Sequence, residues 1–175
     1  MGRFLEIVLL FVGAACGYGV VQDQITALVC IESFTVGHPR LIDSESPTVL
    51  ALFWGVVASW WGGLLIGVGA ACAARLGRRP KLAARDLYRS VLVLLAFMAA
   101  SALGAGLVGF SLAKSGGVWL LEPLASQVAE ADHPRFLANL WAHTAAYGAG
   151  FAGGAVLYVR ILFRRWKAAR VGSRE

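Results

Sequence analysis

The chain has 175 residues, of which 58% are hydrophobic and 15% charged, and its formal net charge is +6. Because globular proteins usually contain about 45 to 50% apolar and about 25% charged residues, this composition excludes a soluble protein. Apart from Glu6, four long segments carry no Asp, Glu, Lys or Arg: residues 5–21, 50–74, 90–113 and 136–159. A helix of about 20 apolar residues crosses the hydrocarbon core of a bilayer. The sequence therefore predicts an integral membrane protein.

In chain order, helical spans are expected at about residues 4–22, 50–75, 89–113 and 135–163. Only helices or closed barrels satisfy their backbone polar groups inside a bilayer, and the short alternating strands of a barrel are absent. The connections are residues 23–49, 76–88 and 114–134, and none is long enough to bury a core of its own. We expect an all-α membrane protein, a four-transmembrane-helix bundle that forms a single domain over residues 1–175.

The charges of the connections indicate an orientation. Residues 75–89 carry six basic side chains against one acid, and residues 160–175 again carry six against one, whereas the other two connections are acidic. Short loops rich in Lys and Arg stay in the cytoplasm. We therefore expect a multi-pass protein of the cell (plasma or inner) membrane with both termini and the 76–88 loop in the cytoplasm, and with loops 23–49 and 114–134 outside.

The same distribution of charge predicts the partners of the basic segments. Anionic lipid head groups attract Lys and Arg next to a membrane surface, so membrane lipids are the expected partner. Nucleic acid is not expected, because its recognition would need a polar surface domain that bears aromatic side chains.

The two outer loops differ in their expected conformation. Residues 22–36 are rich in β-branched side chains and end at a Gly37-His38-Pro39 break, which predicts an extended or β segment. We expect loop 22–49 to form a partly extended extracytoplasmic cap over the bundle. The second outer loop is expected to contain a short helix, from residue 121 to residue 131, with Pro123 in its first turn.

His143 is the most informative polar residue of the spans. In a helix that starts near Arg135, it lies about 12 Å along the axis at 1.5 Å per residue, within the upper part of the membrane. Polar side chains at that depth face the bundle interior. Asp23 and Glu32 belong to the loop above it, so we expect both acids to converge on His143 beneath the cap. The supporting polar residues are Tyr18, Gln22, His38, His133, Asn139 and Tyr147.

An imidazole and two carboxylates are a suitable ligand set for Zn²⁺ or another divalent metal. The spacing of Asp23, Glu32 and His143 matches no defined metal motif, however. One alternative is a structural network in which His143 bonds a carboxylate or a carbonyl and fastens the loop to the bundle. A catalytic or proton-relay role is the other.

Small residues recur at four-residue spacing in every span, as in Gly13 with Gly17, Gly63 with Gly67, and Gly150 with Gly154. In lipid, helices associate through such faces because they allow the backbones to approach closely. We expect the faces to pack the four helices together. A homo-oligomer interface, or a contact with another membrane protein, is left open as the alternative.

Several of these elements also resemble those of a known family. They are the stretch from Tyr18 to Thr26, the Glu32-Ser-Phe-Thr element, the Gly37-His-Pro turn and the Trp141-Ala-His-x-x-x-Tyr motif. Together they are similar to small bacterial four-span integral membrane proteins that have no assigned activity. The resemblance implies that the two acids and the histidine form one functional unit, and it implies no mechanism.

Three classes of function follow from these observations. We expect a small binding or assembly protein with a polar, metal or ligand site beneath its outer cap. A membrane-embedded metal-dependent enzyme is the first alternative, but a nucleophile and a complete ligand set are not recognisable. An oligomeric small-solute transporter is the second, although such proteins usually contain charged or broken helices in mid-membrane.

Overall fold

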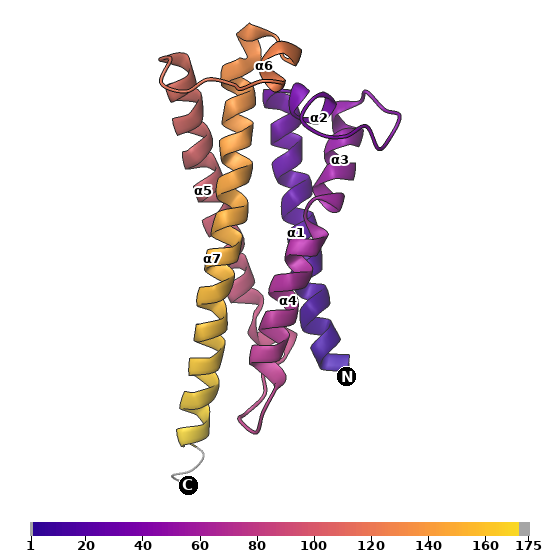
Figure 1. Cartoon of the computed structure of the whole chain (residues 1–175). Coiled ribbons are helices and arrows are strands. Elements are labelled where there is room, and N and C mark those ends of the chain that lie inside the picture. The colour runs from indigo at the N-terminus through magenta and orange to yellow at the C-terminus, as the bar shows by residue number, and fades with distance from the viewer. Residues whose placement is uncertain (1, 172–175) are drawn as a thin grey trace.

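The computed structural model describes residues 2–171, and within this range every regular element is a helix (Figure 1). The elements are α1 (Gly2–Val29), α2 (Glu32–Thr35), α3 (Pro47–Val57), α4 (Trp60–Arg75), η1 (Ala84–Asp86), α5 (Tyr88–Lys114), α6 (Leu124–Gln127), η2 (Glu130–Asp132) and α7 (His133–Val171).

Four helical segments are long and apolar enough to cross a membrane: Gly2–Val29, Pro47–Arg75, Tyr88–Lys114 and Glu130–Arg170. The shortest of them has 27 residues, and at 1.5 Å per residue it is about 40 Å long, which exceeds the roughly 30 Å of a hydrocarbon core. The expected all-helical chain with four helices of spanning length is therefore confirmed.

The outer surface of the spans is apolar. Large side chains such as Leu9, Leu103 and Val159 are more than half exposed, and similar residues occur on every span. A soluble monomer seldom exposes continuous apolar faces of this extent. The surface therefore fits an environment of lipid chains.

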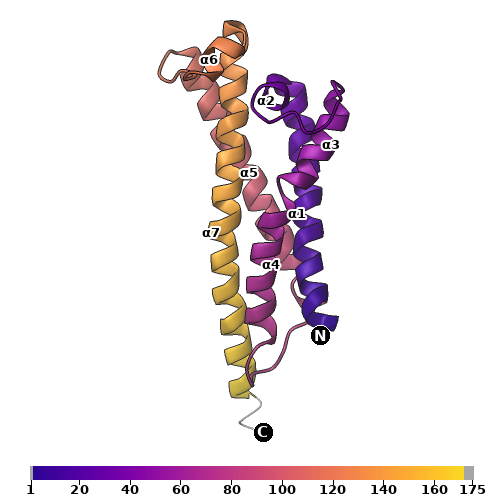
Figure 2. The ribbon, with the colours of Figure 1, turned by 45° about the vertical axis from the view of Figure 1, so that its right-hand side comes forward.

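The spans form two groups (Figures 1 and 2). Helix α1 packs along α3 and α4, while α5 packs along α7, and contact between the groups runs mainly between α4 and α7. A hydrophobic core shared by all four spans lies towards the end where α1 begins and α7 ends. That core contains Ile7, Val8 and Phe11 of α1, Ala70, Ala71 and Ala74 of α4, Val91 and Leu94 of α5, and Leu157 and Ile161 of α7.

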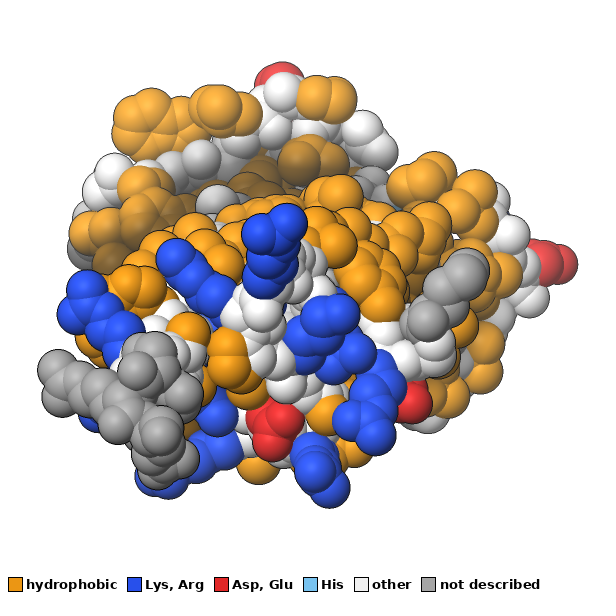
Figure 3. Space-filling model, turned by 90° about the horizontal axis from the view of Figure 1, so that it is seen from below, with side chains coloured by type: hydrophobic (Ala, Val, Ile, Leu, Met, Phe, Trp, Pro, Cys, Tyr) orange, Lys and Arg blue, Asp and Glu red, His pale blue; other side chains and the backbone are white. Residues whose placement is uncertain are grey.

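The two ends of the bundle are named by their charge. The basic end holds the start of α1, the loop between α4 and α5, and the last turns of α7. Viewed from this end, the molecule presents a gathering of Lys and Arg side chains with few acids among them (Figure 3). The opposite, acidic end holds α2, α6 and η2 (Figure 1).

The predicted extended cap is wrong. Helix α1 continues to Val29, and residues 32–35 form the short helix α2. Four side chains of the supposed strand follow helical spacing, and all four are buried: Asp23, Thr26, Ala27 and Cys30. Packing of this face against the rest of the bundle outweighs the preference of β-branched residues for strands, which is weak and depends on context.

The expected outer helix from residue 121 to residue 131 is present only in part. Helix α6 covers Leu124–Gln127, and the short turn η2 follows it. Between them Val128 has an extended backbone, and its side chain is buried in a cluster with Leu120, Phe136 and Leu137. Burying Val128 against the start of α7 therefore interrupts the helix.

The second span was expected as one helix over residues 50–75, and it is broken at Ala58 and Ser59. At this level the backbones of α1 and α3 lie in close contact. A Cβ atom added to Gly19 would overlap Ser59 Oγ and the Gly55 carbonyl oxygen, so the approach requires glycine. A kink in a helix has a local cause such as a Gly or Ser pair or an inserted side chain. Here a tyrosine of α7 occupies the break, as described below.

The helix faces made of small residues differ in what lies beside them. A Cβ atom on Gly63 would lie 2.8 Å from the Phe11 carbonyl oxygen, so Gly63 allows α4 to approach α1 closely, as expected. Gly13 and Gly17 have open space beside them. A homo-oligomer contact through these two glycines stays a prediction.

Candidate functional site

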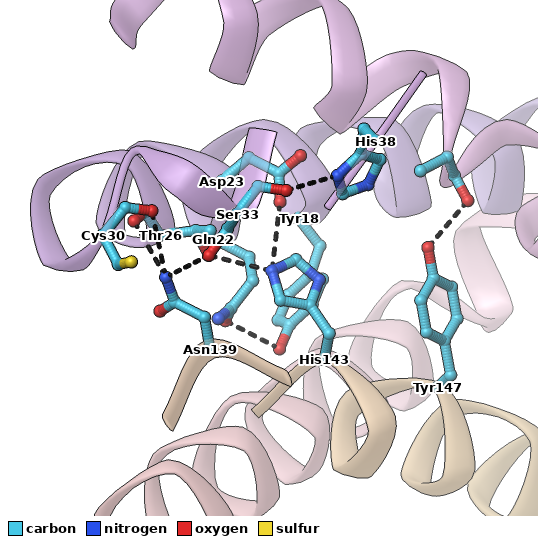
Figure 4. Close-up of polar contacts among 11 residues, drawn as sticks. Tyr18, Gln22, Asp23, Thr26, Cys30, Ser33, His38, Asn139, His143 and Tyr147 are labelled. Atoms are coloured by element: carbon cyan, nitrogen blue, oxygen red, sulfur yellow. Dashed lines mark hydrogen bonds and ion pairs between the residues drawn. The ribbon is translucent and has the colours of Figure 1, made fainter. Parts of the chain in front are cut away.

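The helical continuation of α1 carries Asp23 and Thr26 to the face of α7 (Figure 4). His143 Nε2 lies 2.8 Å from Thr26 Oγ1 and 3.6 Å from Asp23 Oδ1. His143 thus faces the bundle interior and contacts Asp23, as expected. The contact joins the two groups of helices at the acidic end of the bundle.

Asn139, one turn before His143, fastens the end of α1. Its Nδ2 donates to the carbonyls of Thr26 at 3.1 Å and Cys30 at 3.4 Å, and to Ser33 Oγ at 2.9 Å (Figure 4). Both carbonyls also accept a backbone N–H, that of Cys30 at 3.0 Å for Thr26 and that of Ser33 at 3.3 Å for Cys30, so the buried Asn139 adds a second donor to each. Asn139 is therefore part of the structural junction.

Glu32 takes a different partner from the one predicted. Its Oε2 accepts a hydrogen bond from Cys30 Sγ at 3.1 Å, and no ion pair joins it to His143 within residues 2–171. Burial of the thiol and the nearby Glu32 carboxylate raise the pKa of Cys30 to about 11. Cys30 therefore stays protonated, and Glu32, the first residue of α2, bonds to the turn that precedes it.

Two further predicted residues hold local structure. His38 Nδ1 lies 2.6 Å from the Ser33 carbonyl oxygen, and its ring packs on Trp54 with the ring centres 4.5 Å apart. His133 Nε2 lies 3.0 Å from the Val128 carbonyl oxygen and 3.1 Å from that of Ala125. These contacts fix the two loops of the acidic end.

A pocket of about 70 Å³ lies between the two groups of helices, beside the Asp23 and His143 pair. Its polar lining residues belong to α1, α7 and the break in the second span, and they are Tyr18, Gln22, Asp23, Ser59, His143 and Tyr147. The rest of the wall is apolar and includes Phe11, Ile66, Leu94, Leu95, Met98 and Phe151. The pocket therefore combines a small polar region with a long apolar one.

Asp23 is the one carboxylate among the described residues that line this pocket, and it is poorly satisfied. Its side chain is buried, and its contact with His143 at 3.6 Å is longer than a hydrogen bond. Asp23 has no other ion pair and no side-chain hydrogen bond among residues 2–171. An ionised carboxylate can accept about four hydrogen bonds. Asp23 thus retains unused acceptor capacity at the wall of the pocket.

The hydroxyls of Tyr147 and Tyr18 already donate hydrogen bonds within the protein. The Tyr147 hydroxyl donates at 2.9 Å to the Ala58 carbonyl, which belongs to the break in the second span. The Tyr18 hydroxyl donates to Gln22 Oε1 at 3.3 Å. The Tyr147 ring also stacks on Trp61, with the ring centres 6.0 Å apart.

A metal at this position would need more ligands than the pair supplies. Within residues 2–171, no group of three or more His, Cys, Asp and Glu side chains is arranged to hold a metal ion. Protein zinc sites use three or four protein ligands, and Asp23 with His143 would provide two. The expected divalent metal therefore stays a prediction.

Sequence reasoning missed Thr26, Ser33 and the backbone of Ala58 as parts of the site. The signal for Thr26 was present, because it follows Asp23 by three residues and so shares its face on any helix. The contribution of Ala58 could not be read from the sequence, because it depends on the break in the second span.

No protein-family model matches this chain, and no significant similarity connects it with a curated protein or a solved structure. The likeness to small four-span bacterial membrane proteins stays a prediction.

Proposed function

We propose that this protein binds a small amphiphile in the pocket between its two groups of helices. The observation that carries the proposal is Asp23, a buried carboxylate that lines the pocket and has no hydrogen bond of its own among residues 2–171. A polar group that is removed from bulk water and has no hydrogen-bond partner is costly. A ligand that supplied the missing donor would therefore bind where the protein is least satisfied.

The residues that line the pocket indicate the chemical class of the ligand. The head group must donate hydrogen bonds to Asp23, and an amine fits best because it also balances the charge of a carboxylate. The tail must be apolar, because Ile66, Leu95 and Met98 line the pocket beyond the polar residues. The proposed ligand class is an alkyl amine or a related cationic amphiphile.

A small-solute transporter is the second candidate, and one observation favours it. The second span is broken at Ala58 and Ser59, both of which line the pocket. Broken helices expose backbone groups at the substrate sites of many transporters. Uptake of radiolabelled methylammonium by proteoliposomes, compared with protein-free liposomes, distinguishes transport from binding alone.

We also propose an orientation, with the basic end in the cytoplasm of a plasma or inner membrane. Its support is the excess of Lys and Arg in the short segments of that end. The polar residues of the pocket then lie in the extracytoplasmic half of the membrane, at the acidic end of the bundle. Anionic lipids of the cytoplasmic leaflet would surround the basic end.

Trp61 offers a direct binding assay, because its ring packs against Tyr147 and Phe151, which both line the pocket. The probe is a medium-chain bromoalkyl amine, whose bromine quenches tryptophan fluorescence, added to protein in phosphatidylcholine nanodiscs. Saturable quenching is expected, and the variant Trp61→Phe gives the background from the other tryptophans.

Two matched variants test the role of the carboxylate. Asp23→Asn should weaken binding of the bromoalkyl amine by about tenfold or more, which corresponds to about 1.4 kcal/mol. Glu32→Gln removes an acid from the same end of the bundle outside the pocket, and it should bind like the wild type. Quenching that never saturates, or an unchanged affinity in Asp23→Asn, would contradict the proposal.

A further inference from the structure

A second site lies at the basic end, on the lipid-facing side of α5 and α7, and its arginines do not line the pocket of Asp23. We infer that this face binds the phosphate and one acyl chain of an anionic glycerophospholipid. The inference does not depend on the proposed amphiphile.

The polar part of the site is a cavity of about 490 Å³ between the first turn of α5 and the last third of α7. Its polar lining consists of Arg89, Ser90, Arg160, Arg164 and the acid Asp86. Three guanidinium groups against one carboxylate leave a formal charge of 3 − 1 = +2. The cavity is thus suited to an anion.

The arginines of this cavity still have donors to offer. Arg89 and Arg160 have no hydrogen bond or ion pair among residues 2–171, and both are exposed. Arg164 uses one nitrogen, donating to the Asp86 carbonyl at 3.0 Å. The Asp86 carboxylate accepts a hydrogen bond from the Ala83 N–H at 2.8 Å. Most of the guanidinium donors therefore face the cavity without a protein acceptor.

An apolar groove of about 300 Å³ continues from the same cavity along the helices. The two share Ser90, Val93, Leu157 and Arg160, and the groove then extends past Phe97, Gly153 and Val156. Gly153 lets α7 approach α5 here, because a Cβ atom on it would overlap Leu94 Cδ1. A shallow channel between the two helices is the result.

The order of these features matches the order of groups in a phospholipid. Arginine forks bind phosphate oxygens in pairs, and long arginine side chains at a membrane interface extend towards the head groups. An acyl chain attached to that phosphate would lie in the groove between Phe97 and Val156. Free phosphate would use the cavity and leave the groove empty, so the two ligands can be distinguished.

The experiment is native mass spectrometry of the full chain in mild detergent, titrated with short-chain phosphatidylglycerol, phosphatidylcholine of the same chain length, or inorganic phosphate. The wild type should retain phosphatidylglycerol at least about tenfold more tightly than phosphatidylcholine. The double variant Arg89→Gln/Arg160→Gln should lose this preference. The control Arg78→Gln/Arg85→Gln removes two exposed charges of the neighbouring loop and should keep it.

A third variant tests the acyl groove without changing the charge. Ala152 is exposed within the groove, so Ala152→Phe should fill it. It should weaken phosphatidylglycerol binding severalfold and leave inorganic phosphate unaffected. Equal losses in the two arginine pairs would overturn the site in favour of diffuse attraction. Full phosphatidylglycerol binding by Ala152→Phe would overturn the acyl-chain assignment, and equal retention of phosphatidylcholine would overturn the role of the anionic head group.

Discussion

Each end of the bundle contains a buried charged side chain in contact with a neighbouring element. The two side chains differ in how many of their donors or acceptors form hydrogen bonds. At the basic end Arg165 of α7 is only 3% exposed. Its guanidinium donates to four carbonyls at the end of α4 and in the loop that follows, those of Ala73, Leu76, Arg79 and Pro80. These carbonyls lie where the helix can no longer supply partners.

At the acidic end Asp23 is 4% exposed and has one contact of 3.6 Å. Arg165 therefore stabilises the fold, because four of its five N–H donors bind carbonyls of one segment. Asp23 borders a pocket and has unused hydrogen-bond acceptors, as the proposed binding role requires. The comparison teaches that two buried charged residues of one bundle can differ in hydrogen-bond saturation, and on this difference we propose a structural role for Arg165 and a binding role for Asp23.

The largest predicted effect is the loss of Arg165. Arg165→Leu should lower the free energy of unfolding by about 3 kcal/mol or more, because it removes one buried and three partly buried hydrogen bonds from a charged donor. Unfolding in mixed detergent micelles measures the change. Lys167→Leu removes an exposed charge two residues away and should have little effect. Equal stability of the two variants would contradict the structural role of Arg165.

The second-largest loss of stability is expected from replacing Asn139. Asn139→Leu should cost about 1 to 3 kcal/mol in the same assay, because it removes three buried hydrogen bonds, two to the carbonyls of Thr26 and Cys30 and one to the hydroxyl of Ser33. Thr144→Val is the matched control, since its hydroxyl bonds only within its own helix at an exposed position. A neutral Asn139→Leu would mean that the junction at the acidic end is held by apolar packing alone.

Tyr147 should have a smaller effect. Tyr147→Phe removes one hydrogen bond to Ala58 and keeps the ring, so about 1 kcal/mol of stability should be lost. Tyr88→Phe is the control, because Tyr88 is exposed and has no hydrogen bond among residues 2–171. If both changes are neutral, the broken span does not need the tyrosine.

Asp23 should have the smallest effect on stability. Asp23→Asn keeps the shape, loses a weak contact and relieves the cost of burying a charge, so the free energy of unfolding should change by less than about 1 kcal/mol. Asp86→Asn, which removes the carboxylate bonded to the Ala83 N–H at the basic end, is the control expected to destabilise more. The reverse order would show that Asp23 is structural.

Much of the fold could be predicted from the sequence, because lipid requires long apolar helices. The third expected span, residues 89–113, agrees with α5 to within one residue at each end. The contact of His143 with Asp23 was also expected, since polar groups avoid lipid. Both predictions depend on burial rather than on detailed geometry.

The remaining features depend on tertiary contacts. β-Branched residues such as Ile25 suggested a strand, and the packing of Asp23 and Thr26 against α7 made that segment helical. The break at Ala58 involves Tyr147, which lies 89 residues later. Arg165 was expected among the head groups, and its burial depends on the path of the loop after α4.

The most direct test of the account measures two quantities on one preparation of Asp23→Asn. These are the affinity for the bromoalkyl amine, from quenching of Trp61, and the free energy of unfolding. We predict that the affinity falls by about tenfold or more, while the free energy of unfolding stays within about 1 kcal/mol of the wild-type value. Unchanged affinity together with a clear loss of stability would contradict the account, because Asp23 would then hold the fold together as Arg165 does.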